Sequence, residues 1–216
     1  AAASRAIRLM SSGRLKSEGI TAEVIAMECT ICGLCAKVCP YNAITVDVRA
    51  KTPARITVAA CAGCGTCAAE CPSNAIVMHH FTDQQIQSQV DVLTEDRPDS
   101  RILVFACNWC SYAGADFAGV SRLQYPPNTR LIRTMCSGRV SEKFIWRAFE
   151  RGAPVVLVSG CHFGDCHYID ANHWTDRRIK RLWKKMEKLG LRPERLQLEW
   201  ISAAEGVRFK EVMEKM

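Results

Sequence analysis

The chain has 216 residues, of which 48% are hydrophobic, and a formal net charge of +7 at pH 7. This length suits one or two domains with hydrophobic cores, and no apolar run approaches the roughly 18 residues of a membrane helix, so no direct membrane insertion is expected. The first residues, Ala1–Ile7, lack the apolar core of an export signal. With 13 cysteines in the chain, these features predict a reducing compartment, the cytoplasm, and metal binding rather than disulfides.

The first 94 residues divide into a helical segment and an internal repeat. Residues 1–26 are rich in alanine and contain Ile7, Leu9 and Met10, which predicts an N-terminal helical segment. Residues 27–94 are expected to form one domain with two similar halves, each a cysteine loop, a short helix and a Pro-x-Asn-Ala-Ile segment leading into a strand. These strands are predicted at 44–48 and 76–78, with a further β-type stretch at 55–58 and a helix over 81–94.

Two copies of one cysteine motif, C-x2-C-x2-C-x3-C-P, occupy the two halves of this repeat. They comprise Cys29, Cys32, Cys35 and Cys39 in the first half and Cys61, Cys64, Cys67 and Cys71 in the second. In two-cluster ferredoxins such a run holds [4Fe–4S] clusters, and its fourth cysteine ligates the other cluster. We therefore predict an α+β ferredoxin-like unit with cubane one on Cys29, Cys32, Cys35 and Cys71, and cubane two on Cys61, Cys64, Cys67 and Cys39. Zinc is less favoured, because structural zinc sites use separated ligand pairs.

The remainder of the chain alternates strands with helices. Apolar strands are predicted at 102–106, 131–135, 155–158 and 196–201, and helices at Ser141–Arg151, capped by Ser141, and at 172–189. This order predicts a small α/β domain over 100–216, with a parallel sheet covered on both faces. Residues 94–100, which are charged and contain Pro98, are expected to be a linker.

The helix predicted at 172–189 carries much of the positive charge. Its basic residues are Arg177, Arg178, Lys180, Arg181, Lys184, Lys185, Lys188 and, just beyond it, Arg192. Such a run is compatible with nucleic-acid binding. Apolar residues recur at helical spacing and are expected to face the core: Ile179, Leu182, Trp183, Met186 and Leu189. We therefore favour a solvated helix face that docks a partner, with no nucleic acid bound.

Five further cysteines follow the predicted strands of the second domain. They are Cys107, Cys110, Cys136, Cys161 and Cys166. The carboxyl ends of parallel strands converge on one crevice, so we expect these thiols to meet there. Four of them would suffice for a [2Fe–2S] cluster, while zinc or a dithiol/disulfide pair are the alternatives. His162 and His167 are expected to orient the loops through hydrogen bonds rather than to ligate.

Three segments of the second domain resemble a known family. Phe105–Asp116, Met135–Val140 and Gly160–Tyr168 are similar to the delta subunit of methyl-viologen-reducing (F420-non-reducing) hydrogenase, over roughly residues 100–210. Residues 1–95, including His80–Ile86, resemble the carboxyl-terminal portion of the A subunit of heterodisulfide reductase, with its two-cluster ferredoxin insert. The resemblance implies one [2Fe–2S] cluster on four of the five cysteines of the second domain.

The resemblance also implies a role. It implies an electron-transfer subunit of a heterodisulfide-reductase-type, flavin-based electron-bifurcating complex of anaerobic metabolism such as methanogenesis. In this larger hetero-oligomer the chain would relay electrons between a hydrogenase or formate dehydrogenase and the flavin-containing A subunit of the reductase. Similar fusions leave two related complexes open, the methylene-tetrahydrofolate reductase type and the menaquinone-linked type of sulfate reducers.

Other features of the sequence limit the chemistry of this chain. It has no G-x-G-x-x-G after a predicted strand, so FAD is expected on a partner. No acid/base pair or nucleophile constellation stands out, and the chain is therefore interpreted as an electron carrier within an oxidoreductase. If the second domain binds zinc or keeps free thiols, it would instead be a thiol-redox docking module.

Overall fold

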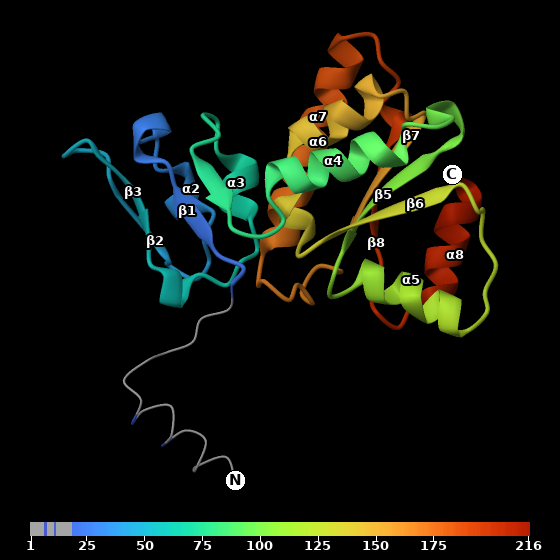
Figure 1. The fold of residues 1–216 in the computed structure, drawn as a ribbon, viewed down its shortest axis with the longest axis horizontal. Coiled ribbons are helices and arrows are strands. Elements are labelled where there is room, and N and C mark those ends of the chain that lie inside the picture. The colour runs from blue at the N-terminus through green and yellow to red at the C-terminus, as the bar shows by residue number, and fades with distance from the viewer. Residues whose placement is uncertain (1–6, 8–10, 12–18) are drawn as a thin grey trace.

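The computed structural model describes Ile7, Ser11 and residues 19–216, which form two packed units (Figure 1). Most of the helical segment predicted at 1–26 lies outside the described residues. Ile7 and Ser11 are helical, whereas Ala22–Val24 form strand β1, which pairs with β4 (Ile76–Met78). The predicted helical segment is therefore wrong at Ala22–Val24, because these residues complete a sheet of the first unit.

The first unit is built from two antiparallel strand pairs and two short helices. Besides β1 and β4, its elements are α2 (Leu34–Lys37), β2 (Ile44–Asp47), β3 (Thr52–Ile56) and α3 (Thr66–Glu70). β1 pairs with β4 and β2 with β3, so each pair joins the strand before one cysteine loop to the strand after the other loop. This arrangement brings the two cysteine loops close together.

The second unit contains a four-stranded parallel sheet, as predicted. Its strands are β5 (Ile102–Cys107), β6 (Thr129–Thr134), β7 (Val155–Gly160) and β8 (Leu196–Trp200), in the spatial order β6-β5-β7-β8. All six residues of β5 are buried, which explains why this central strand reads as a continuous apolar run rather than an alternating one.

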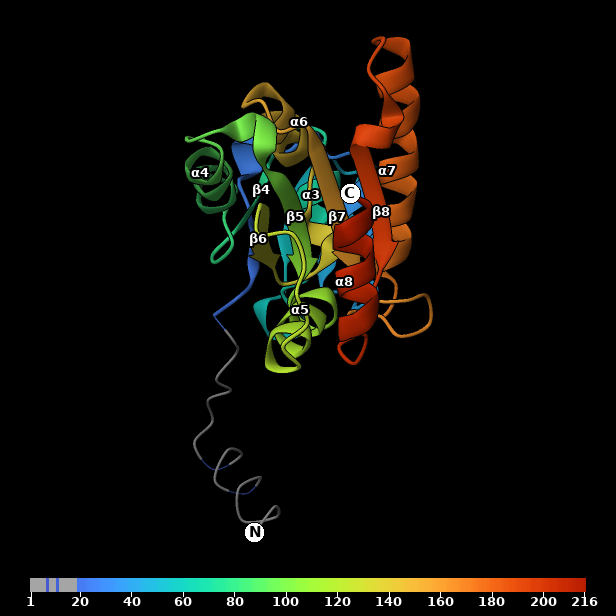
Figure 2. The ribbon, with the colours of Figure 1, turned by 90° about the vertical axis from the view of Figure 1, so that its right-hand side faces the viewer.

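Helices cover both faces of this sheet (Figure 2). One face packs against α4 (Asp83–Leu93), α6 (Glu142–Glu150) and α7 (Ala171–Lys188), and the other against α5 (Ser111–Val120) and α8 (Gly206–Lys215). The sequence interpretation missed α5 and α8. In α5 small residues obscure the helical period, and Gly114 fits closely against the backbone of Ser202.

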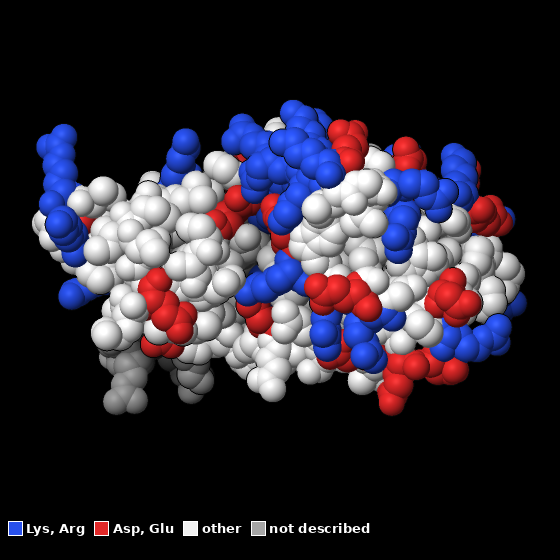
Figure 3. All heavy atoms as spheres, turned by 90° about the horizontal axis from the view of Figure 1, so that it is seen from above, with Lys and Arg blue, Asp and Glu red and all other residues white. Residues whose placement is uncertain are grey.

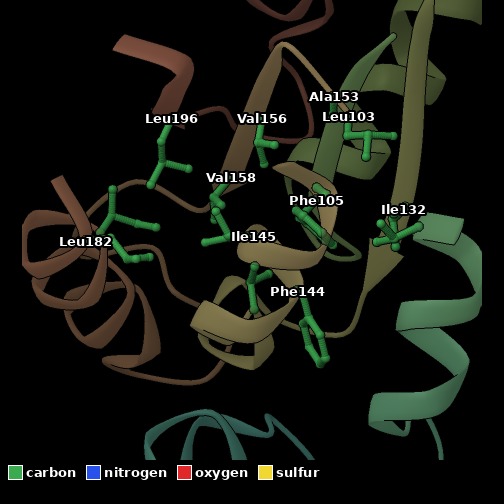
Figure 4. Packing of buried hydrophobic residues seen from close by; sticks show 14 of the residues in the cluster. Leu103, Phe105, Ile132, Phe144, Ile145, Ala153, Val156, Val158, Leu182 and Leu196 are labelled. Carbon is green, nitrogen blue, oxygen red and sulfur yellow. The ribbon is translucent and has the colours of Figure 1, made fainter. Parts of the chain in front are cut away.

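The main core lies between the sheet and α6 and α7 (Figure 4). There Phe105 stacks on Phe144, and Leu103, Val158 and Leu182 are fully buried. α4, which the sequence interpretation assigned to the first domain (27–94), adds Ile86 and Val90 to this same core. Its first turn is fixed by a capping box in which Thr82 and Gln85 exchange hydrogen bonds. The boundary between the two units therefore falls before α4 rather than after it.

The basic helix α7 only partly matches the prediction. Ile179, Leu182 and Met186 face the core, but Leu189 is exposed and Arg178 is buried. Lys and Arg side chains gather on the face seen from above in Figure 3, and those of α7 that are exposed are Arg177, Lys180, Arg181, Lys184, Lys185 and Lys188.

The helix α6 begins where the sequence predicts it. Ser141 occupies the position before its first residue, but the Ser141 hydroxyl makes no capping hydrogen bond.

Among the described helices, none has both the length and the apolar character needed to cross a membrane.

Candidate metal centres

The first cavity of the ferredoxin-like unit gathers cysteines from both loops. It is lined by four thiols together with apolar side chains that include Val24, Val46 and Ile76. The thiols are those of Cys29, Cys32, Cys35 and Cys71. They are the same four residues that the sequence analysis assigns to cubane one. Cys32 is exposed, so this cavity lies near the surface.

The second cavity gathers the complementary set. It is lined by Cys39, Cys61, Cys64 and Cys67, with Val38, Ile44 and Ile56 among its apolar walls. Burial raises the pKa of the Cys64 and Cys67 thiols. Thiols must lose their protons to ligate a metal, so metal binding here would release protons.

Two glycines allow the second loop to pack tightly. Gly63 and Gly65 have φ values of +74° and +75°, in the left-handed region that favours glycine. A Cβ atom on Gly63 would overlap the backbone oxygen of Ile20, and one on Gly65 would overlap the side chain of Arg139. Both glycines are therefore required by the surroundings of this loop as well as by its conformation.

The five remaining thiols meet at the carboxyl end of the parallel sheet. Cys107 ends β5, while Cys136 and Cys161 follow β6 and β7, and these three are at most 2% exposed. The Sγ atom of Cys161 lies 2.6 Å from that of Cys110 and 3.8 Å from that of Cys107. All five thiols are free. The structure thus brings together the cysteines that the sequence places at one crevice, and we call this group the five-thiol site.

Hydrogen bonds among these thiols give them different pKa values. Hydrogen bonding with the Cys110, Cys136 and Cys161 thiols lowers the pKa of Cys107. The same bonds to Cys107 raise the pKa of Cys110 and of Cys136. The backbone N–H of Gly138 also donates to the Cys136 sulfur, at 3.3 Å. Among these thiols, Cys107 is therefore the one that its neighbours favour as a thiolate.

Polar and aromatic side chains hold the loops of the five-thiol site. The buried Asn172 donates to the carbonyl oxygens of Cys161 and His162. His162 Nε2 lies 2.7 Å from Glu205 Oε2, and His167 stacks on Trp109, whose Nε1 donates to the Tyr168 hydroxyl. Both histidines thus contact loop side chains, whereas no sequence pattern indicated the roles of Asn172 or Tyr168.

The second cavity and the five-thiol site are neighbours. Cys136 and Tyr168 form a buried cluster against which Tyr41, Cys64 and Cys166 pack. Burial, followed by the nearby Cys64, raises the pKa of Tyr41 to about 12. The order along the molecule is therefore first cavity, second cavity, five-thiol site. The cysteine spacing alone did not predict which cubane lies next to the second domain.

A buried ion pair joins the two units beside these sites. Glu70, at the end of α3, accepts from Nε of Arg178 at 2.9 Å and from Arg181 at 2.9 Å, and Arg178 also donates to the carbonyl of Val140. Glu70 lies between Cys67 and Cys71 in the sequence, so this contact fixes the cysteine-bearing helix against α7.

The chemistry of these side chains suits iron–sulfur clusters. Each cavity offers four thiols inside apolar walls, as a [4Fe–4S] cluster requires. Soft thiolates in the five-thiol site suit Fe–S clusters or zinc. Within the described part of the chain, no three His, Cys, Asp or Glu side chains are arranged to hold a single metal ion.

Comparison with known families agrees with this division. The profile described as "Methyl-viologen-reducing hydrogenase, delta subunit" matches residues 102–216, and that described as "4Fe-4S dicluster domain" matches residues 28–75. The dicluster match supports [4Fe–4S] clusters in the ferredoxin-like unit.

Curated relatives cover both units. The A subunit of the ferredoxin/F(420)H(2)-dependent CoB-CoM heterodisulfide reductase of Methanosarcina acetivorans is 43% identical over 97% of this chain and 26% of that protein. Its counterpart in Methanosarcina mazei, from a ferredoxin:CoB-CoM heterodisulfide reductase, is 42% identical with the same coverage. The iron-sulfur D subunit of the vhc F420-non-reducing hydrogenase of Methanococcus voltae is 50% identical over 53% of this chain and 80% of that protein. The resemblance predicted from the motifs is confirmed, and the chain spans about a quarter of the length of the two reductase proteins.

Proposed function

This chain belongs to the family of the methyl-viologen-reducing hydrogenase delta subunit, and we propose that it is an electron-transfer subunit of a heterodisulfide-reductase-type complex. The observation that carries the proposal is the row of three thiol sites, in which Cys64 of the second cavity packs beside Cys136 and Cys166 of the five-thiol site. Clusters bound at these sites would supply one-electron steps. A relay along this row needs no acid, base or nucleophile of its own.

The cysteines divide the work of holding these clusters. Cys29, Cys32, Cys35 and Cys71 would hold cubane one, and Cys39, Cys61, Cys64 and Cys67 would hold cubane two. Four of the five cysteines of the five-thiol site would hold a [2Fe–2S] cluster. The burial of Cys107, Cys136 and Cys161 keeps water from the third site, and Asn172 fixes the loop that follows Cys161.

The proposed partners stand at the two ends of this row. Electrons from a hydrogenase or formate dehydrogenase would enter at the five-thiol site, pass to cubane two and then to cubane one, and leave for a flavin on the partner that corresponds to the reductase A subunit. The exposed Cys32 supports cubane one as the exit. We further propose that the chain works in the cytoplasm, since its 13 free thiols suit a reducing compartment.

Metal analysis tests the proposal. The anaerobically purified chain should contain about ten irons, from two cubanes and one binuclear cluster. Cys136→Ser should remove the EPR signal of the binuclear cluster and leave both cubane signals, because Cys136 lines only the five-thiol site. Cys32→Ser is the matched control, and it should affect cubane one alone. About eight irons, with zinc or five titratable thiols in the second unit, would contradict the relay and favour a thiol-redox docking module.

A further inference from the structure

A buried arginine packs against the loop of the proposed cubane two and follows Cys136 of the five-thiol site closely in the sequence. Arg139 ends the 3-10 turn Ser137–Arg139, which directly follows Cys136, and its side chain is 2% exposed. We propose that Arg139 raises the reduction potential of cubane two above that of cubane one. The inference rests on the proposed assignment of Cys39, Cys61, Cys64 and Cys67 to cubane two.

The contact with Gly65 places Arg139 beside cubane two. The aliphatic part of the Arg139 side chain occupies the space that a Cβ atom on Gly65 would need. Gly65, between Cys64 and Cys67 in the sequence, lines the second cavity and not the first, and Arg139 contacts the second cavity from outside through Gly65. Cys136 and the turn after it thus bring a thiol to the five-thiol site and the Arg139 side chain to the second cysteine loop.

The guanidinium group is held rigidly and away from water. Its Nε and Nη2 donate to the carbonyl oxygen of Phe81 at 3.1 and 3.0 Å, and its Cζ lies 4.9 Å above the ring of Phe144. Its Nη1 is buried with no hydrogen-bond partner among the described residues. The positive charge is therefore fixed in one place by the Phe81 carbonyl and the Phe144 ring.

The charges around Arg139 do not cancel. Nη2 of Arg139 pairs with Asp83, and Asp83 also pairs with Lys143. Burial opposes the ionisation of Asp83, but hydrogen bonds from Lys143 and Arg139 outweigh it and lower the pKa of this carboxyl. Two cations and one carboxylate therefore leave a net positive charge next to the loop of cubane two.

A positive charge at this place has a definite effect on reduction. Taking up one electron makes a cluster one unit more negative, and a nearby buried cation stabilises that form. The effect falls with distance, so it acts more strongly on cubane two than on cubane one. Cubane two, the middle cluster of the proposed relay, would therefore be reduced in preference to cubane one. Transfer to cubane one would then depend on the partner's oxidation of cubane one.

Redox titration of the anaerobic holoprotein, followed by EPR, tests this inference. The cubane two signal is assigned as the one that Cys61→Ser removes. In Arg139→Met we expect the oxidised-to-reduced ratio of cubane two at a fixed potential to rise about tenfold, a shift of about 59 mV to more negative potential for one electron. Arg139→Lys, which keeps the charge, should restore most of the original potential. Asp83→Asn, which leaves Arg139 in place, should shift cubane two in the opposite direction.

The control is Arg147→Gln, which removes a cation that pairs with Asp91 on the outer side of α4 and α6. It should leave both cubane potentials unchanged. An unchanged potential in Arg139→Met, or an equal shift of both cubanes, would overturn the inference. Absence of cubane signals from the unmodified chain would instead overturn the proposed function, so the two failures are distinguishable.

Discussion

Replacing Glu70 with alanine is expected to lower the free energy of unfolding by about 3–5 kcal/mol, the cost of leaving one partner of a buried ion pair uncompensated. Arg178 is 1% exposed and would keep only its bond to the carbonyl of Val140. Burial lowers the pKa of Arg178 and the Glu70 carboxylate raises it, so loss of Glu70 would leave the effect of burial unopposed by its main partner. Urea unfolding of the anaerobic holoprotein, followed by circular dichroism, measures the loss.

Two variants make this prediction specific. Asp91→Ala removes the partner of Arg147 in a half-exposed pair between α4 and α6, and its effect should be much smaller because water screens both charges. The double variant Glu70→Leu with Arg178→Met should recover most of the lost stability, since apolar side chains of similar volume can replace a buried pair. A loss in Glu70→Ala no larger than that in Asp91→Ala would contradict the prediction.

The ion pair also bears on the proposed relay. Glu70 follows Cys67 by three residues and precedes Cys71, while Arg178 lies on α7, whose first turn holds the five-thiol loop through Asn172. The same helix therefore contacts the proposed ligand loops of both units. This geometry explains why a basic helix, interpreted from sequence as a solvated face, carries a fully buried arginine.

The parts of the fold that the sequence predicts are those with a strong local pattern. β5 is a run of six apolar residues, and it is buried on both sides. The cysteine motifs also carry their own geometry, and the two cavities group the thiols as the crossed pattern predicts. α5 lacks such a pattern, because its alanines and glycines fit both a helix and a loop. Its helical conformation depends on packing against α8, which the local sequence does not indicate.

The interactions that the sequence does not predict join residues far apart in the chain. Glu70 and Arg178 are 108 residues apart, and Arg139 reaches Phe81 across 58 residues. The residues that flank Arg139 and Arg178 in the sequence do not distinguish these two buried arginines from exposed ones. Their burial depends on how the ferredoxin-like unit packs on the sheet, and this packing also determines which cubane neighbours the five-thiol site.

Replacing Gly63 with alanine is expected to remove cubane two and leave cubane one. The φ of Gly63 is +74°, and a Cβ atom there would overlap the backbone oxygen of Ile20, which cannot rotate away as a side-chain end can. The loop from Cys61 to Cys64 would have to move away from Ile20. Its two proposed ligands, Cys61 and Cys64, would then leave the positions needed to bind cubane two. Iron and acid-labile sulfide should each fall by about four per chain.

Gly164→Ala is the matched control for this loss. Gly164 lies between Cys161 and Cys166 with a φ of +90°, but nothing lies within 4 Å of the position that its Cβ would take. This variant therefore meets only the conformational cost of a left-handed alanine, about 1–2 kcal/mol, and it should keep its full iron content. Equal iron loss in the two variants would mean that backbone conformation, rather than the contact with Ile20, limits the loops. Full iron in Gly63→Ala would mean that the second cavity tolerates a looser loop than its packing indicates.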